Sequence, residues 1–220
     1  ARYRKSYNIF LKMFNKIFCV SDDDYHQIKM NISNDKIYKI GNPRYDRILS
    51  NLENVEYKLD SSRQDEGNIL IFASMWDEDN KIIFEKFINS PLVNHFKKVI
   101  IVPHEVNDSY LNYYCSVLED NDFSFKKINQ YQNFNQFEEE YIIINKVGFL
   151  SKLYAQSTIA YVGGGFSKSG IHNIIEPAAA SNPVIFGSNF LNSNKSDAEG
   201  LIDVSGGFSV DSYELFSEKI

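Results

Sequence analysis

The residues best suited to binding chemistry lie between Ile159 and Gly187. An apolar run ends there at three consecutive glycines, and a second apolar run opens at Ile174 after a turn rich in Ser and Gly. This pattern predicts a strand, a glycine turn and a helix. Glycines leave backbone N–H groups without side-chain cover, beside a helix start that favours negative charge. We therefore predict a phosphate or carboxylate site at Gly163, Gly164 and Gly165.

Three polar side chains follow this turn at a spacing that lets them face one crevice: His172, Asn173 and Glu176. The Glu176 carboxylate could accept hydrogen bonds from the two hydroxyls of a ribose, while His172 and Asn173 donate to an anion. A capping box is the alternative, with Asn173 as the N-cap and Glu176 bonding back to its N–H. Capping does not explain three glycines in a row, so we favour a ligand site.

The run VGGGFSKSGIHNIIEPAAASNPVIFG resembles the donor-binding half of Kdo transferases. These glycosyltransferases move 3-deoxy-D-manno-octulosonic acid (Kdo) from its CMP ester onto a lipid A precursor. The family pattern is a glycine cluster, then G-x-H-N-x-L-E, a small-residue helix and P-V-x-x-G. After the glycines, the matching segments here are Gly170–Glu176, Ala178–Ala180 and Pro183–Gly187.

Weaker blocks of the same pattern occur in the same order along the chain, so the resemblance spans nearly everything from Tyr38 to Val210. The later blocks are similar to the form found in Bacteroidetes-type members. Five blocks in order are far more specific than any one of them. The four further blocks are Ile37–Ile48, Ile69–Asn80, Val99–Val106 and Ile144–Tyr154.

The chain departs from the family pattern at several positions. His104 and Glu105 stand where many relatives carry Arg-His, and Phe149 stands where they carry a Glu. The loop Ser188–Asp197 is longer than usual, with Asp197 in place of a Glu. The contacts of His104, Glu105 and Phe149 therefore cannot be carried over directly.

Apolar runs alternate with helical stretches after residue 68, which predicts an α/β fold with a doubly wound parallel sheet. The resemblance implies that this Rossmann-like sheet is the C-terminal half of a GT-B glycosyltransferase. The expected strands are Ile69–Ala73, Val99–Val102, Tyr141–Ile144, Ile159–Val162 and Val184–Phe186, and the expected helices are Asp79–Phe87, Asp108–Leu118, Phe149–Ala155 and Ile174–Ala180.

Ligands of such sheets bind outside the carboxyl ends of the strands, so the residues that follow the strands should surround one crevice. We expect six of them to join the glycine turn in donor binding: Ser74, Trp76, His104, Glu105, Val147 and Gly148. Simpler roles are open for several. Trp76 could be a packing residue, His104 and Glu105 an ordinary turn, and Ser74 a helix cap.

The chain is expected to divide into three parts. Residues 1–50 would be the tail of a truncated acceptor domain, 51–68 a polar connector, and 69–220 the donor-binding domain. In the first part, Tyr3 to Ile17 predicts a basic amphipathic helix, which we expect to dock on a core and not on a membrane. Short strands are expected at Phe18–Val20 and Ile37–Ile40, with a helix start at Ser21 to Asp24.

Composition excludes several function classes. The net charge of -6 supplies no basic field for nucleic acid. Cys19 and Cys115 form no metal-ligand spacing, and both are expected to be ordinary, partly buried thiols. No apolar run is long enough to span a bilayer, so a soluble fragment is expected. We predict no metal and no cofactor.

The resemblance implies an inverting transfer of Kdo from CMP-Kdo to a lipid A precursor. It places the general base, a Glu, in the missing N-terminal domain, so this fragment is expected to bind donor and transfer nothing. The full-length protein would act at the cytoplasmic face of the bacterial inner membrane. Two alternatives remain open: a UDP- or GDP-sugar glycosyltransferase or epimerase, and a non-catalytic interaction module.

Overall fold

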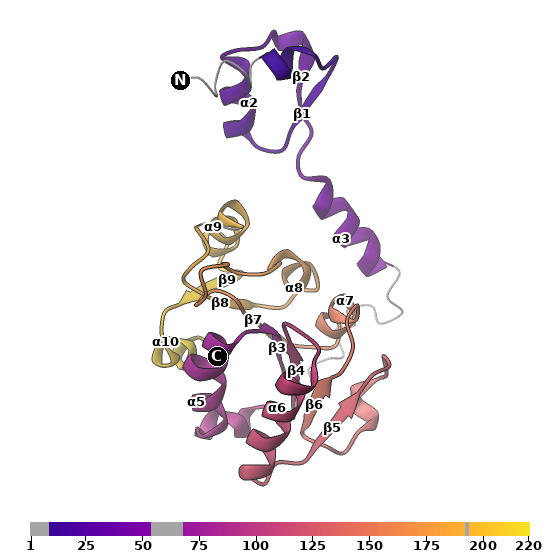
Figure 1. The fold of residues 1–220 in the computed structure, drawn as a ribbon, viewed down its shortest axis with the longest axis vertical. Helices are drawn as coiled ribbons and strands as arrows, with labels where there is room; N and C mark the ends of the chain where they lie inside the picture. The colour runs from indigo at the N-terminus through magenta and orange to yellow at the C-terminus, as the bar shows by residue number, and fades with distance from the viewer. Residues whose placement is uncertain (1–8, 54–67, 192–193) are drawn as a thin grey trace. The chain divides into compact units, whose positions relative to one another are not determined.

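The computed structural model of this protein describes residues 9–53, 68–191 and 194–220. It forms two compact units, Ala1–Ser50 and Asn51–Ile220, which are described separately (Figure 1). Most of the predicted connector, residues 54–67, and the part of the predicted N-terminal helix at Tyr3 and Tyr7 lie outside the described residues.

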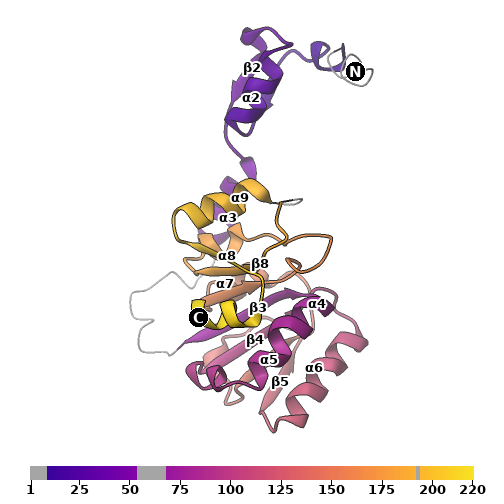
Figure 2. The ribbon, with the colours of Figure 1, turned by 90° about the vertical axis from the view of Figure 1, so that its left-hand side faces the viewer.

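The second unit is built on one sheet of seven strands that are all parallel, in the order β5-β6-β4-β3-β7-β8-β9 (Figures 1 and 2). The predicted doubly wound α/β fold is therefore confirmed, and so are the five predicted strands. The strands are β3 (Ile69–Met75), β4 (Lys98–Pro103), β5 (Phe125–Ile128), β6 (Tyr141–Ile144), β7 (Ile159–Val162), β8 (Val184–Gly187) and β9 (Gly207–Val210).

Two strands, β5 and β9, were not predicted. Both are edge strands, so each pairs with only one neighbour and is less deeply buried. Lys126 and Lys127 of β5 are exposed, and β9 is fully buried only at its two ends. Neither strand therefore carries the continuous apolar run that marks the central strands.

The four predicted helices are present with slightly different ends. The first is continuous from Asp77 to Ile88, with a π-helical segment between two α-helical ones. Helices α9 and α10 are not predicted by the sequence pattern, and α9 begins within the predicted loop Ser188–Asp197. The helices of this unit are α4 (Asp77–Asp79), a π-helix (Asn80–Phe84), α5 (Glu85–Ile88), α6 (Asp108–Asp120), α7 (Leu150–Tyr154), α8 (Ile175–Ala179), α9 (Lys195–Asp203) and α10 (Tyr213–Lys219), with 3-10 turns at Pro91–His95 and Phe134–Gln136.

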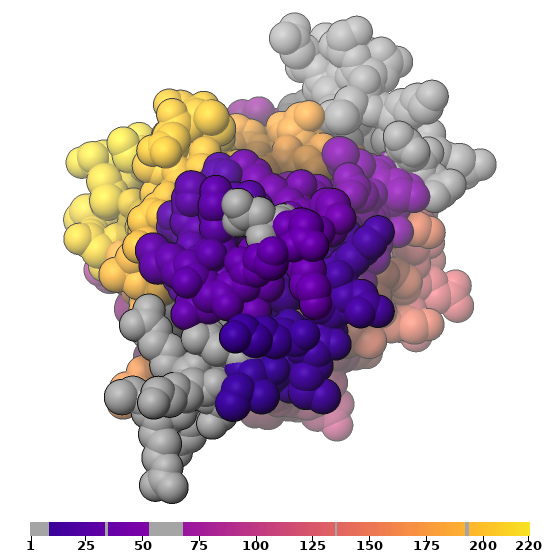
Figure 3. Space-filling model, turned by 90° about the horizontal axis from the view of Figure 1, so that it is seen from above, coloured from indigo at the N-terminus to yellow at the C-terminus, as the bar shows by residue number. Residues whose placement is uncertain are grey.

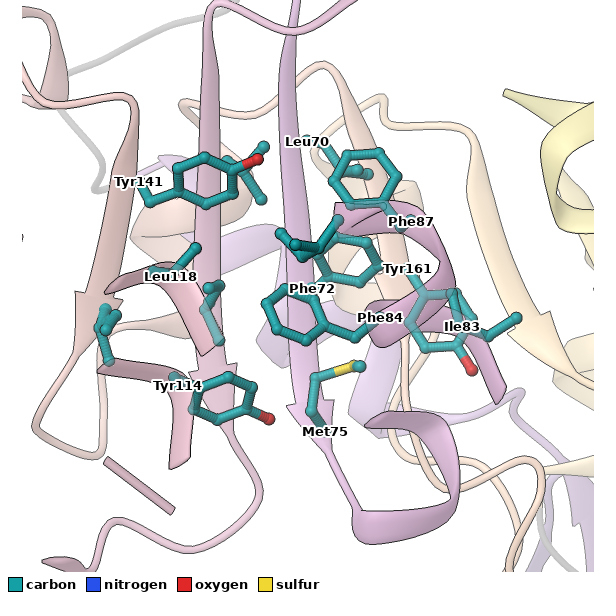
Figure 4. Close-up of a cluster of buried hydrophobic side chains, with 14 of the residues drawn as sticks. Leu70, Phe72, Met75, Ile83, Phe84, Phe87, Tyr114, Leu118, Tyr141 and Tyr161 are labelled. Carbon is teal, nitrogen blue, oxygen red and sulfur yellow. The ribbon is translucent and has the colours of Figure 1, made fainter. Parts of the chain in front are cut away.

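The core lies on both faces of the sheet because successive side chains of a strand point to opposite sides. In β3, Leu70 and Phe72 pack under α5, α6 and α10, and Ile71 packs on the other face with residues of α7. Phe72 makes edge contacts with Phe84 and Phe87 at ring-centroid distances of 5.5 and 5.2 Å (Figure 4). Burial of such a ring stabilises the fold by about 2 kcal/mol.

Strand β3 lies in the middle of the sheet, with β4 on one side and β7 on the other. After β3 the chain first builds one side of the sheet, with β4, then the edge strand β5, and then β6 between them. It then crosses to the other side of β3 and continues through β7, β8 and β9. The direction of winding reverses between β3 and β7. Ligands of doubly wound sheets bind at this switch point, outside the carboxyl ends of the strands.

The first unit contains β1 (Ile17–Cys19) and β2 (Ile37–Lys39), which pair in parallel, with α2 (Asp22–Lys29) between them in sequence. The predicted strands and helix start are confirmed, since Ser21 caps α2 by accepting a hydrogen bond from the Asp24 N–H at 3.1 Å. The helix predicted as far as Ile17 is wrong at its end. Helical structure stops at Lys12, because Ile17 pairs with Ile37 in the sheet.

The first unit has a small apolar core and several exposed apolar side chains. Its core consists of Leu11, Cys19, Ile32 and Ile37. Figure 3 shows one face of this unit in indigo and violet. The exposed large apolar side chains of this unit include Ile9, Phe10, Met13, Phe14, Phe18, Val20, Met30, Tyr38 and Ile40.

Helix α3 (Pro43–Glu53) follows the first unit's strands and takes up the first three residues of the predicted connector. We did not predict it, although Pro43 at its first position is a common helix-start signal. Across the described residues, no helix has both the length and the apolar character needed to cross a membrane.

Candidate functional site

Three aromatic side chains from distant parts of the chain meet at the carboxyl edge of the sheet. Trp76 follows β3, His104 follows β4 and His172 follows β7. The Trp76 and His104 rings stack with centroids 3.8 Å apart, and His104 and His172 lie 4.6 Å apart. The Trp76 Nε1–H donates a hydrogen bond to His172 Nε2 at 2.8 Å. The predicted convergence of these blocks is confirmed for all three residues.

The hydrogen bond from Trp76 defines the protonation state of His172. Because an indole nitrogen can only donate, the His172 Nε2 must accept and therefore carries no proton. The ring is then neutral, with its proton on Nδ1. Burial lowers the pKa of His172, and the neighbouring His104 lowers it further. Burial also lowers the pKa of His104, although the Glu105 carboxylate opposes this shift. Both imidazoles are thus neutral at pH 7.

A pocket opens beside this stack, between the ends of β3, β4 and β6. Four of the predicted donor-binding residues line it: Ser74, His104, Val147 and Gly148. Lys146 and Phe149 also line it, and we predicted neither as a ligand contact. Lys146 is the one residue with a full charge among the described residues that form this pocket. An ammonium group there suits an anionic ligand.

Ser74 is placed in this pocket by an irregularity in β3. Its backbone has a φ of 56°, and the pairing of β3 with β4 shifts register between Ala73 and Met75. Such bulges re-aim side chains at the ends of strands. The helix-cap alternative for Ser74 is wrong, because the N-cap position of α4 is Trp76.

The prediction of free N–H groups in the glycine turn is wrong for two of its three residues. The Gly163 N–H donates to the Ala73 carbonyl at 2.8 Å, which extends the pairing of β3 and β7. The Gly164 N–H donates to the Asp79 carboxylate, also at 2.8 Å. All three glycines are buried. Because these two donors are already paired within the protein, they are not free to bind a phosphate.

Close packing explains the glycines instead. A Cβ on Gly165 would lie 2.5 Å from the Gly187 Cα, and a Cβ on Gly163 would overlap the Ser74 carbonyl oxygen. Gly164 has a φ of +95°, where side chains are strained. Gly187 ends β8, so the glycine of the P-V-x-x-G motif is needed for the same approach of two backbones.

Asn173 and Glu176 form a pair just before and within α8. The Asn173 Nδ2 donates to Glu176 Oε1 at 2.7 Å, and the Ile175 N–H donates to Asn173 Oδ1 at 3.1 Å. The N-cap position is Ile174, so the capping box considered as the alternative, with Asn173 as the N-cap, is not formed. Both side chains are partly exposed. The second Glu176 oxygen has no partner among the described residues.

Glu105 is exposed and accepts a hydrogen bond from the Asn107 Nδ2 at 3.2 Å. It does not line the pocket beside His104. Its geometry fits the ordinary-turn interpretation, since Asn107 is the N-cap of α6.

Two further residues hold the site together, and no motif in the sequence marks them for this role. Asp79 is completely buried and bonds the glycine turn. Asn194 has a φ of 54° and donates to the carbonyls of Ile171 and His172 at 2.9 and 3.1 Å. Both act across long sequence separations, so local spacing carries no signal for them.

No metal-binding cluster of His, Cys, Asp and Glu occurs in the part of the chain that the structure describes. Cys19 and Cys115 are free and buried.

No family model matches this chain. A 3-deoxy-D-manno-octulosonic acid transferase of Chlamydia trachomatis is 29% identical over 90% of the chain and 46% of its own length. A bifunctional glycosyltransferase/methyltransferase of Fusobacterium nucleatum is 27% identical over 100% of the chain and 34% of its own length. The chain thus spans less than half the length of these curated relatives. The resemblance to Kdo transferases that the motifs indicated is confirmed.

Among solved structures, the chain is similar to the C-terminal CMP-Kdo binding domain of WaaA from Acinetobacter baumannii. The TM-score is 0.58 at 16% identity, over 79% of this chain and 88% of that domain. This likeness confirms the Rossmann-like fold expected of a GT-B donor domain.

Proposed function

We propose that this chain supplies the CMP-Kdo-binding half of a glycosyltransferase that moves Kdo from CMP-Kdo to a lipid A precursor. The observation that carries the proposal is the array of Trp76, His104 and His172 at the edge of the sheet where the winding reverses. The similarity to Kdo transferases supports it independently.

The phosphate of the donor is the group whose charge changes during the reaction. As CMP leaves, negative charge grows on its phosphate while the sugar becomes oxocarbenium-like, so donors aimed at the phosphate stabilise the transition state. The N–H groups of Gly163 and Gly164 are already hydrogen-bonded within the protein, so we do not assign them to the phosphate. We assign this role to the Lys146 ammonium and the His172 Nδ1–H, which act without a metal or cofactor.

The ribose is assigned to Glu176. The hydrogen bond from Asn173 orients one carboxylate oxygen at 2.7 Å, and the other oxygen is left to accept from a ribose hydroxyl. Asn173 is thus proposed to position Glu176, whereas we had predicted that it contacts an anion directly. The exposed backbone of Val147 and Gly148 would frame the nucleotide on the opposite side.

The remainder of the reaction is proposed to lie in the rest of the protein. There, a Glu would deprotonate the acceptor hydroxyl, which attacks the Kdo carbon with inversion. The full-length enzyme would work at the cytoplasmic face of the inner membrane, where a lipid A precursor is accessible.

Binding of CMP tests the proposal most directly. A ligand that binds only the folded state raises its stability by mass action, by about 2.7 kcal/mol at a hundred times Kd. We expect CMP to raise Tm more than UDP or GDP does. A larger shift with UDP or GDP would favour another nucleotide-sugar enzyme, and no shift with any of the three would favour a non-catalytic module.

Calorimetric titration of two variants tests the ribose contact and the phosphate contact separately. Glu176→Ala should weaken CMP about tenfold, because hydrogen bonds to a charged group contribute about 1.5 kcal/mol or more. The matched control Glu119→Ala, at an exposed position of α6, should not. Lys146→Met should weaken CMP and leave cytidine binding unchanged, since cytidine has no phosphate. Equal losses for CMP and cytidine would remove Lys146 from the phosphate site.

A further inference from the structure

Asp79 is an acidic residue with no solvent exposure, at 0%. Its Oδ2 accepts hydrogen bonds from the backbone N–H of Gly164 at 2.8 Å and of Trp76 at 3.1 Å. Its Oδ1 accepts a hydrogen bond from the Tyr161 hydroxyl at 2.7 Å. One side chain therefore bonds three groups, on β7, on the turn after β7 and on the turn after β3.

A carboxyl group in this place is costly for the fold. Burial raises the pKa of Asp79, although the hydrogen bonds from Tyr161, Gly164 and Trp76 act in the opposite direction. No cation contributes to this balance, and the nearby charge of Glu78 raises the pKa further. Burying such a group is favourable only when its oxygens are fully hydrogen-bonded. The three hydrogen bonds from Tyr161, Gly164 and Trp76 therefore offset the cost of burying Asp79.

The groups that Asp79 joins carry the two ends of the Trp76–His172 hydrogen bond. Trp76 is held directly through its own backbone N–H. His172 is held indirectly, because its backbone N–H donates to the Gly163 carbonyl at 3.3 Å and Gly163 adjoins the bonded Gly164. Gly163 also packs so closely on Asp79 that a Cβ there would lie 2.8 Å from Oδ2. This carboxylate therefore links the two turns beyond the point where the backbone pairing of β3 and β7 ends.

We propose that Asp79 is a positioning residue for donor binding. Its carboxylate holds the glycine turn against the end of β3, so that Trp76 and His172 meet in the hydrogen-bonded arrangement that presents the His172 Nδ1–H to the ligand. Asp79 itself touches no ligand. The consequence for CMP affinity rests on the proposed function, and the consequence for the Trp76–His172 bond does not.

Three variants distinguish a positioning role of Asp79 from a general effect on the stability of the protein. Asp79→Ala removes all three bonds. Asp79→Asn keeps an oxygen for the two backbone N–H groups and turns its amide toward Tyr161, whose hydroxyl can accept as well as donate. Tyr161→Phe is the matched control, because it removes a buried bond to the same carboxylate and leaves the two turns tied together.

The first measurement needs no ligand. Trp76 is the only Trp of the chain, so the indole N–H signal in a proton–nitrogen NMR spectrum reports the bond to His172. We expect slow solvent exchange of this proton in the wild type, Asp79→Asn and Tyr161→Phe, and fast exchange in Asp79→Ala. An unchanged signal in a folded Asp79→Ala protein would overturn the proposal.

The second measurement is calorimetric titration with CMP. We expect Kd to rise about tenfold in Asp79→Ala and to stay close to the wild-type value in Asp79→Asn and Tyr161→Phe, even where Tm falls. An equal rise of Kd in Tyr161→Phe would mean that stability alone is responsible and would overturn the proposal. If the wild type does not bind CMP, the proposed function fails, and the indole signal still decides the role of Asp79. If Asp79→Ala does not fold, Asp79→Asn decides the question. Loss of the slowly exchanging Trp76 indole signal in that variant would overturn the inference.

Discussion

The turns after β7 and after β6 both end parallel strands at the same edge of the sheet, and both contain glycine, but they use it in opposite ways. Gly163 to Gly165 are buried, and most of the space that their side chains would occupy is filled by backbone atoms. Gly148 is exposed, has a φ of +94° and has nothing within 4 Å of its absent Cβ.

Glycine therefore has two different roles at this edge of the sheet. The triple glycine lets backbones approach and serves the fold, whereas the single Gly148 leaves a backbone surface beside the pocket open to a ligand. The more prominent motif is thus the scaffold of the proposed site. Binding is assigned to other residues at this edge of the sheet, among them Lys146, Gly148 and His172.

Among the substitutions that test this comparison, Gly165→Ala should have the largest effect on stability. Its Cβ would meet the Gly187 backbone at 2.5 Å, and Gly187 cannot shift without disturbing the pairing of β8 with β9. We expect a loss of about 3 kcal/mol in the free energy of unfolding, measured by urea denaturation. A loss below 1 kcal/mol would show that the two backbones are not closely packed.

Gly148→Ala should have a smaller effect on stability and a separate effect on binding. The strain of a side chain at positive φ costs about 1 kcal/mol, with no steric clash to add to it. Because the turn changes its conformation to relieve this strain, CMP affinity should fall in calorimetric titration. Unchanged affinity would remove this turn from the proposed site.

Gly200→Ala is the control, with a change of opposite sign. Gly200 lies in α9 with nothing within 4 Å of its absent Cβ, and its φ is not positive. Alanine should stabilise the protein by about 0.5 to 1 kcal/mol, because glycine in a helix loses more backbone entropy. Destabilisation in the same urea experiment would mean that the helix differs from the structure described above.

The smallest effect should come from pH. The pKa of His172 is lowered by folding, so the folded state binds fewer protons than the unfolded state, and stability falls as pH drops below the unfolded value of about 6.5. Protonation of His172 Nε2 also removes the acceptor for Trp76. We expect Tm to fall by about 2 °C more in the wild type than in His172→Gln between pH 7.5 and 5.5. Parallel curves would contradict the assigned protonation state.

Much of the fold was predictable, because the central strands are continuous apolar runs that alternate with helical stretches. The edge strands β5 and β9 escaped prediction, since neither is a continuous apolar run. The blocks that form the site were also predictable, as Ser74, Trp76, His104 and His172 follow strands. What local spacing could not show was the pairing of Gly164 with Asp79, 85 residues away. That contact changes the predicted role of the glycine turn.

The central position of β3 has a consequence for how the protein acquires its site. Strand β4 follows β3 closely and can pair with it early, but β7 can pair with β3 only across a separation of about 89 residues. Closing so long a segment is entropically slow. On the ribosome, β3, β4 and β6 emerge before β7 does. The half-sheet that carries Trp76 and His104 can therefore form first, and nucleotide-binding competence should appear only at the end of folding.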